Sequence, residues 1–313
     1  MLGKTAGGLF WMFRYLERSE NIARLVDAGQ RIALTRSDAA ASEWGSILAT
    51  AGARDAYLQK YDAFEGANAV DFLLRDKDNP SSVMSVISSA RDNARLVRTA
   101  LTREVWEAVN ECYLTLKKLL ARKISERDLP DVLGIIRQRS VYVRGALHGT
   151  MMRNDIYDFA RIGTFLERAD NTARILDVKY YVLLPSANFV GSSLDNVQWE
   201  TILRSVSGEG AFRHNYGSDS TPADIAEFLI LDRRMPRSLA FCYSKISANL
   251  GYLEADYGDR HPCHDTADAV NARIRASTVD LIFEGGLHEF IQDFLRFNAM
   301  LGQQIEQDYR FYG

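Results

Sequence analysis

A segment near the start of the chain occurs again, with changes, in its middle. LERSENIARLVD at Leu16–Asp27 and LERADNTARILD at Leu166–Asp177 are identical at seven of twelve positions. A second pair, FLLRDKDNPSS at Phe72–Ser82 and FLILDRRMPRS at Phe228–Ser238, shares Phe, Leu, Asp, Pro and Ser in the same order. The offsets of 150 and 156 residues are nearly equal. An internal duplication therefore explains the two matches better than chance does.

Helical periodicity dominates both copies. Val, Ile and Thr never alternate with polar residues over a strand-length run, and only 6 prolines interrupt the chain. We therefore predict an all-α fold with two pseudo-symmetric, bundle-like repeats, residues 1–152 and 153–313, packed into one globular unit. The expected long helices cover about 8–36, 103–121 and 129–152 in the first repeat, and 155–184, 264–284 and 287–309 in the second.

The repeated FLxxDxxxPxS segment predicts the end of one helix and the start of another. A short helix should end near Asp76 or Asp232, and Pro80 or Pro236 should lie in the first turn of the next helix, where no N–H is needed. Asn79 could cap the first of these helices. Loops are expected at 125–130, 185–196, 208–222 and 258–262. The most irregular of them, 208–222, is the best candidate for a site-forming loop, although such segments are more often plain loops.

Charge and cysteine content restrict the classes of partner. A formal net charge of −3 gives no global field that would gather nucleic acid or an anionic membrane. The three cysteines are far apart and form no CxxC, which favours neither disulfides nor a zinc knuckle. No apolar run approaches the roughly 18 residues of a membrane span, and the run at 6–13 continues into a charged helix without a cleavage site. We predict an unexported, cytoplasmic protein.

Matched polar residues follow one side of the two repeated helices. We call this set the Glu–Asn–Arg stripe, and it consists of Glu17, Asn21 and Arg24 in the first copy and Glu167, Asn171 and Arg174 in the second. If the helices cross antiparallel about a pseudo-twofold axis, Glu17 would face Arg174. Glu167 would then face Arg24. Alternatively, the stripe lines a cleft that binds a polar ligand or a partner protein.

Two arginines project from the apolar faces of the same helices. Arg18 and Arg168 each need a partner there, because a guanidinium is costly to bury alone. Asp76 and Asp232 are candidate structural partners, since both are matched between copies and both follow helix ends. The alternative is that both arginines extend past their neighbours to solvent.

These segments also carry a resemblance. The chain resembles the bacterial alpha-E domain family over essentially its whole length. The resemblance rests on the start MLGKTAGGLFWMFRYLERSENIAR, the second LERADNTAR and the two FLxxDxxxPxS segments. The resemblance implies an all-α protein encoded beside a circularly permuted ATP-grasp enzyme, and often a transglutaminase-like peptidase. The ATP-grasp partner would use its own ATP and Mg²⁺ to join a carboxylate to an amine. The family offers no established catalytic residue to carry over.

Other motifs are weak. His261-Pro-Cys263-His264, with acidic residues nearby, has the ingredients of a metal site, but its spacing fits no standard zinc pattern and favours a solvated loop between helices. No E-x-x-H pair of the di-iron bundle type occurs. The sequence therefore predicts no metal, no cofactor and no catalytic residue on this chain.

Two functional hypotheses remain open. The first is a non-catalytic scaffold or accessory subunit that binds the ATP-grasp ligase of a peptide or amide-bond-forming system. The second is an enzyme or enzyme half-site, in which the Glu–Asn–Arg stripe and Arg18 with Arg168 line a pocket for a carboxylate or phosphate. Charges that pair inside a closed core would favour the scaffold. Unpaired charges in a deep cleft would favour the enzyme.

Overall fold

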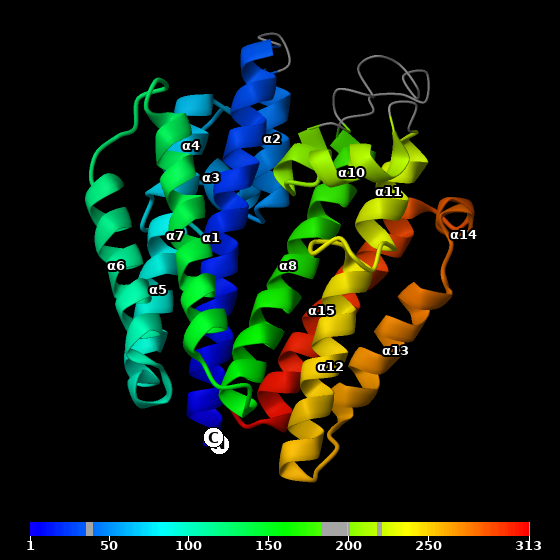
Figure 1. Ribbon diagram of the computed structural model, residues 1–313. Coiled ribbons are helices and arrows are strands. Elements are labelled where there is room, and N and C mark those ends of the chain that lie inside the picture. The colour runs from blue at the N-terminus through cyan, green and yellow to red at the C-terminus, as the bar shows by residue number, and fades with distance from the viewer. Residues whose placement is uncertain (36–39, 183–198, 200, 218–220, 313) are drawn as a thin grey trace. The chain divides into compact units, whose positions relative to one another are not determined.

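The computed structural model describes residues 1–35, 40–182, 199, 201–217 and 221–312 (Figure 1). Within these residues every regular element is a helix, as predicted, and none of the helices is long and apolar enough to cross a membrane. The predicted loop at 185–196 lies outside the described residues. The chain forms two compact units, Met1–Glu167 with Tyr309–Gly313 (unit 1) and Arg168–Asp308 (unit 2). The boundary falls inside helix α8, Asp155–Val182.

Unit 1 is built around a bundle of four long helices. Helix α1 contacts α5 and α7, and α6 contacts the same two helices from the other side, which closes the bundle (Figure 1). The predicted long helices of the first repeat are thereby confirmed, with α1 beginning five residues earlier than expected. The helices of this unit are α1 (Gly3–Thr35), α2 (Ala40–Thr50), α3 (Arg54–Leu58), α4 (Gly66–Leu74), α5 (Val83–Leu96), η1 (Arg98–Ala100), α6 (Arg103–Leu119) and α7 (Leu129–Thr150).

Apolar residues at helical spacing form the core of this bundle. On α5, Val83, Val86, Ile87 and Ala90 are all at most 1% exposed, and their i, i+3, i+4, i+7 spacing places them on one face. On α1, apolar residues are buried on more than one side, because α4, α5 and α7 all pack against this helix. Helix α1 is therefore the central helix of unit 1, and polar side chains along it also become buried.

A close helix crossing and the end of the chain complete unit 1. A Cβ atom added to Gly163 of α8 would lie 3.0 Å from the carbonyl carbon of Phe10 and closer still to its oxygen, so only glycine fits at this crossing. Phe311, 4% exposed, lies with its ring centroid 5.4 Å from Phe10 and 6.0 Å from Phe159. The last residues of the chain therefore fill the core beside the first helix.

Unit 2 is built from long helices of its own. Helix α13 contacts α12 and α15. Asp177 of α8 accepts hydrogen bonds from α15, at 2.6 Å from His288 and 2.8 Å from Gln292, and Thr172 of α8 donates to the Arg237 carbonyl just before α12. The helices are α10 (Glu209–Tyr216), α11 (Pro222–Ile230), α12 (Leu239–Tyr257), α13 (Pro262–Ala276), α14 (Val279–Glu284) and α15 (Leu287–Asp308).

The long helices and the helix that ends in the FLxxDxxxPxS segment follow one another in the same order in the two units, although the shorter helices between them differ. A long helix (α1 or α8) is followed by a short helix that ends in the FLxxDxxxPxS segment (α4 or α11). Three further bundle helices come next, α5, α6 and α7 in one unit and α12, α13 and α15 in the other. The pseudo-symmetric placement of the two repeats relative to each other stays a prediction.

Two predictions about unit 2 are wrong. The expected helix 264–284 is two helices, because α13 ends at Ala276 and Thr278 caps the start of α14 by accepting a hydrogen bond from the Leu281 N–H at 3.3 Å. The segment 208–222, expected to be a loop, contains α10. Its Phe212 ring stacks on Tyr216 at 4.8 Å and packs on Phe228 at 5.4 Å, so aromatic contacts hold this short helix against α11.

The repeated proline segment folds in the same way in both units, but not as predicted. Pro80 and Pro236 lie in a turn before the helix, and Ser82 and Ser238 are the N-caps of α5 and α12. Asn79 is not the cap. Its buried amide instead donates to the Phe72 carbonyl at 3.0 Å and accepts from the Ser81 N–H, which ties the turn to the end of α4.

The N-cap of α12 provides a first prediction. The Ser238 hydroxyl accepts a hydrogen bond from the Phe241 N–H at 3.0 Å and donates to the Asp232 carbonyl, and the residue is fully buried. We expect Ser238→Ala to lower the free energy of unfolding by about 1–2 kcal/mol, because both partners lose their hydrogen bond. Urea denaturation followed by circular dichroism measures this change. Ser277→Ala, at an exposed hydroxyl, is the control and should cost less than about 0.5 kcal/mol.

Candidate functional site

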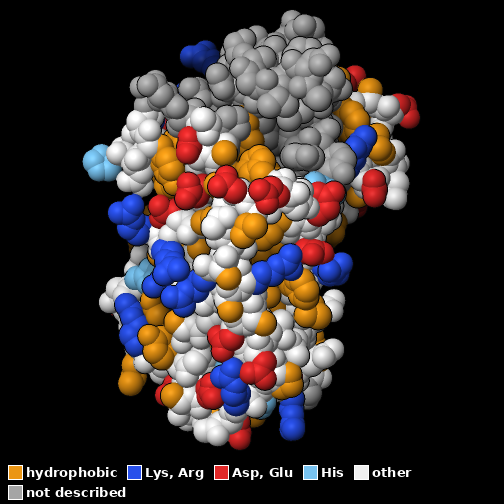
Figure 2. Space-filling model, turned by 90° about the vertical axis from the view of Figure 1, so that its right-hand side faces the viewer, with side chains coloured by type: hydrophobic (Ala, Val, Ile, Leu, Met, Phe, Trp, Pro, Cys, Tyr) orange, Lys and Arg blue, Asp and Glu red, His pale blue; other side chains and the backbone are white. Residues whose placement is uncertain are grey.

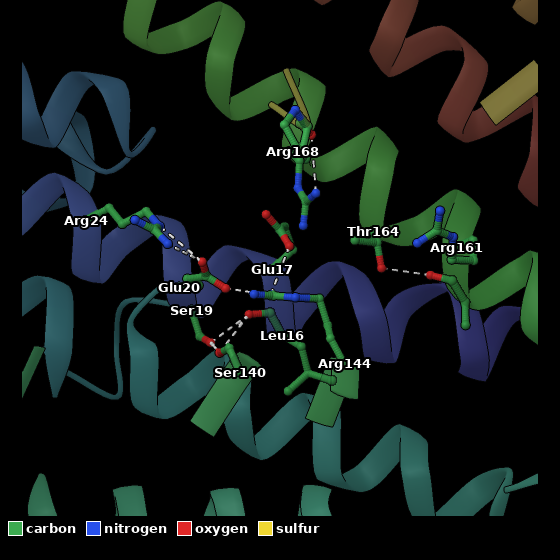
Figure 3. Close-up of polar contacts among 12 residues, drawn as sticks. Leu16, Glu17, Ser19, Glu20, Arg24, Ser140, Arg144, Arg161, Thr164 and Arg168 are labelled. Carbon is green, nitrogen blue, oxygen red and sulfur yellow. Dashed lines mark hydrogen bonds and ion pairs between the residues drawn. The ribbon is translucent and has the colours of Figure 1, made fainter. Parts of the chain in front are cut away.

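The repeated helix places a charged network inside unit 1 (Figure 3). Glu17 and Glu20 of α1 are 1% and 0% exposed. Arg144 reaches them from α7, with Nη1 at 3.2 Å from Glu17 Oε2 and 2.5 Å from Glu20 Oε2. Arg24 lies one turn along α1 from Glu20 and donates to its Oε1 at 2.6 Å. Two buried carboxylates therefore share a guanidinium from a neighbouring helix, and Glu20 also has one on its own helix.

Glu167, the matched glutamate of α8, is held by two arginines of α1. Arg18 donates from Nε at 2.5 Å and from Nη2 at 2.9 Å to the two carboxylate oxygens, and Arg14 Nε donates at 2.9 Å. This two-pronged geometry is the strong form of an arginine–carboxylate pair. Burial raises the pKa of Glu167, but the charges of Arg18 and Arg14 outweigh it and lower the pKa to about 2. Glu167 is therefore ionised at neutral pH.

Aromatic rings flank these arginines. The Arg14 guanidinium lies 4.5 Å from the Trp11 ring centroid and 5.5 Å from that of Phe10, and Arg18 lies 5.9 Å from the Tyr15 ring. A guanidinium over a ring face is attracted to it, and the ring also excludes water. The arginines are therefore oriented from two sides, by the carboxylate and by the rings.

The predicted pairing across the stripe is partly wrong. Glu167 does not face Arg24, because Arg14 and Arg18 occupy its oxygens and Arg24 is held by Glu20. Arg174 donates to Asp170 at 2.6 Å, four residues earlier on α8, which mirrors the pair of Arg24 and Glu20. The pairing of Glu17 with Arg174 concerns residues of different units and stays a prediction. Asn21 and Asn171 are also buried, at 3% and 8% exposure.

The predicted partners of Arg18 and Arg168 are wrong as well. Asp76 accepts from Lys60 Nζ at 2.7 Å and from the Asp78 N–H, and Asp232 accepts from the N–H groups of the two residues that close its turn. Aspartates that follow a helix end commonly close such turns, which explains their repetition. Arg168 instead donates to the Pro236 carbonyl at 3.3 Å.

Sequence reasoning missed Arg14, Glu20 and Arg144. The sequence did contain a signal that Glu20 belongs to the network, since its counterpart in the second copy is Asp170 and each acid precedes an arginine by four residues. No such repetition marked Arg14, because its counterpart in the second copy is Thr164. Arg144 lies far along the chain on α7, so only the packing of α7 on α1 brings it to the network.

The histidine and cysteine cluster is the start of helix α13. His264 is 2% exposed, with Nδ1 at 3.0 Å from the His261 N–H and Nε2 at 3.1 Å from the Leu250 carbonyl. Burial and the adjacent Asp308 carboxylate raise the pKa of the Cys263 thiol, so it is a poor ligand at neutral pH. The interpretation as a solvated loop is wrong, because the cluster is a buried helix start. Among the described residues, no group of three or more His, Cys, Asp or Glu side chains could hold a metal ion.

The chain is similar to a known protein family and to several mycobacterial proteins. A family model described as a predicted alpha-helical domain with a conserved ER motif matches residues 1–310. Glu17-Arg18 and Glu167-Arg168 are Glu–Arg dipeptides of this kind. Uncharacterized proteins of Mycobacterium bovis and of two strains of Mycobacterium tuberculosis are each 23% identical over 292 residues, 88% of this chain. The chain spans about a third of their length, 32%. No solved structure matches the chain.

Proposed function

This chain belongs to the Alpha-E family, and on that basis we propose that it is a non-catalytic helical accessory protein that binds a circularly permuted ATP-grasp ligase. The ligase would carry the ATP and Mg²⁺ and would form a peptide or amide bond. A transglutaminase-like peptidase is the second proposed partner of the same system. The chain would act in the cytoplasm.

The observation that supports this proposal most is that the buried glutamates of unit 1 are paired with arginines. Glu17, Glu20 and Glu167 are buried and already bound by arginines of the same unit. A general acid near neutral pH needs a raised pKa, whereas the pKa of Glu167 is lowered to about 2. Carboxylates bound in this way fix the packing of helices and are poorly suited to accept or donate a proton during catalysis. The Glu–Arg pairs of unit 1 therefore fit a structural role.

The relatives supply independent support. In the mycobacterial proteins, the part similar to this chain covers only 32% of the length, so about two thirds of each polypeptide lies outside it. A domain that makes up only part of a longer polypeptide in these relatives fits a module that works beside other protein domains. An accessory role explains this arrangement without requiring chemistry on the module itself.

The proposal is tested with the purified chain and the ATP-grasp ligase encoded beside it. We expect the two proteins to elute together in size-exclusion chromatography and this chain to raise the rate of ATP turnover by the ligase. Absence of a complex together with an unchanged rate would contradict the proposal.

A variant separates the accessory role from the enzyme hypothesis. Glu17→Ala combined with Glu167→Ala removes both repeated carboxylates. If the residues are structural, this variant unfolds at a lower temperature but, below that temperature, stimulates the ligase as the wild type does. Loss of stimulation in a folded variant, with thermal unfolding unchanged, would favour an enzyme half-site. The control is Glu107→Ala, which removes an exposed ion pair with Arg103 on α6.

A further inference from the structure

An apolar groove lies between α13 and α15 in unit 2. Val270, Ile274 and Phe294 form its floor and are 7%, 2% and 4% exposed. Phe297 and Met300 of α15 also line it, and Met300 is 44% exposed. Figure 2 looks onto the side of the molecule that carries α13, where apolar side chains (orange) lie beside basic ones (blue) across the middle. Half-buried Phe290 and Phe297 and the exposed Met300, above a buried apolar floor, distinguish the groove from an ordinary solvated helix face.

The size of the groove matches side chains of a helix. Its volume is about 230 Å³, below the roughly 300–1,000 Å³ of typical small-molecule sites. An apolar cavity of about 150 Å³ already holds a benzene-sized group, so the groove accommodates one or two apolar side chains. Its lining runs from Thr266 to Ile274 along α13, a rise of about 12 Å. Apolar residues at positions i, i+4 and i+7 of a docked helix span about 10.5 Å.

Positive charge is in excess at the rim. Arg273 lies over the Phe290 and Phe297 rings at 5.7 and 5.9 Å, and Arg296 lies over Phe297 at 5.4 Å. Among the described residues both arginines pair with one carboxylate, Asp293, at 3.3 and 2.7 Å. Two guanidinium groups and one carboxylate leave one surplus positive charge, on a chain whose formal net charge is −3. An acidic side chain of a partner would complement this rim.

We propose that this groove binds an amphipathic helix of a partner protein, with apolar residues at i, i+4 and i+7 and an acidic residue beside them that pairs with Arg273 and Arg296. A second copy of this chain is a poorer occupant, because a symmetric contact through this face would bring the arginines of both copies together. The inference deepens the proposed function, since it rests on the chain acting by binding a partner and names a surface for it.

The test uses the full chain alone and two synthetic, fluorescein-labelled helical peptides of about 15 residues. Both carry Leu at i, i+4 and i+7. One carries Glu beside the Leu residues and the other carries Lys. We expect fluorescence anisotropy to show that the Glu peptide binds at least about tenfold more tightly than the Lys peptide. Saturable binding of neither peptide, or equal binding of both, would overturn the proposal.

Three variants locate the binding. Arg273→Glu should remove the preference for the Glu peptide. Arg275→Glu is the matched control, because Arg275 is exposed on the same helix, two residues away and so on the opposite side. Ala269→Trp, at an exposed position that lines the groove, should weaken binding of both peptides. An equal effect of Arg275→Glu and Arg273→Glu would contradict the site.

The remaining outcomes are also informative. All variants are compared with the wild type by thermal unfolding, so that weaker binding is assigned only to folded protein. If sedimentation shows a dimer of the wild type that Ala269→Trp dissociates, the occupant is a second copy and the proposal is wrong. Because no ligase is present, failure of peptide binding leaves co-elution with the ligase standing, and the reverse also holds.

Discussion

Replacing Gly163 with alanine is expected to lower the free energy of unfolding of unit 1 by about 3 kcal/mol or more. The new Cβ would meet the backbone of Phe10, at 3.0 Å from its carbonyl carbon and 3.1 Å from its Cα, and closer still to its oxygen. Backbone atoms cannot move aside as the end of a flexible side chain can, so α1 and α8 would have to separate. Urea denaturation followed by tryptophan fluorescence reports mainly on this unit, because three of the four tryptophans, Trp11, Trp44 and Trp106, lie in it.

The chain contains a matched control for this substitution. Gly145 lies inside α7, also in unit 1, and a Cβ added there would meet nothing within 4 Å. Gly145→Ala should therefore stabilise the helix by about 0.5–1 kcal/mol, the usual difference between the two residues in a helix. If both substitutions had the same sign and size, the close crossing of α1 and α8 would be wrong.

The fold could be predicted from sequence because the signals for helices are local. Apolar spacing along residues such as Val83, Val86 and Ile87 identifies a helix and its buried face without knowledge of any neighbour. The duplication identified the helices that recur in the two halves. Helix ends were less certain, since Pro80 fits a turn before a helix as well as a first helical turn.

The partners of the charged residues could not be predicted, because they depend on which helices pack together. Repetition singled out Glu17 and Glu167, which are buried and paired. Repetition did not single out Arg14 or Arg144, because neither residue was matched between the two copies. Both nevertheless supply contacts to the buried glutamates. The same repetition suggested Asp76 as the partner of Arg18, although this aspartate closes a turn. A matched residue therefore indicates a shared constraint but does not name the contact.

Glu167→Gln is expected to destabilise unit 1 by about 3–5 kcal/mol at pH 7. The amide keeps the shape of the side chain but loses the charge, which leaves Arg14 and Arg18 with one neutral partner in a largely buried site. Glu107→Gln serves as the control, because Glu107 and Arg103 are 57% and 80% exposed and their pair should contribute at most about 0.5 kcal/mol. Urea denaturation at constant ionic strength gives both values.

A sharper test is the pH dependence of the free energy of unfolding of the wild type and of Glu167→Gln. The carboxyl of Glu167 has a pKa of about 2 in the folded chain, against an ordinary value of 4.5. A lowered folded pKa means that the stabilisation is complete above about pH 4.5 and is lost as the pH falls toward 2. The difference in free energy of unfolding between wild type and Glu167→Gln should therefore be constant from pH 7 to 5 and shrink steadily below that. A difference that stays level down to pH 2.5, or that grows, would mean that Glu167 is not ionised between the two arginines.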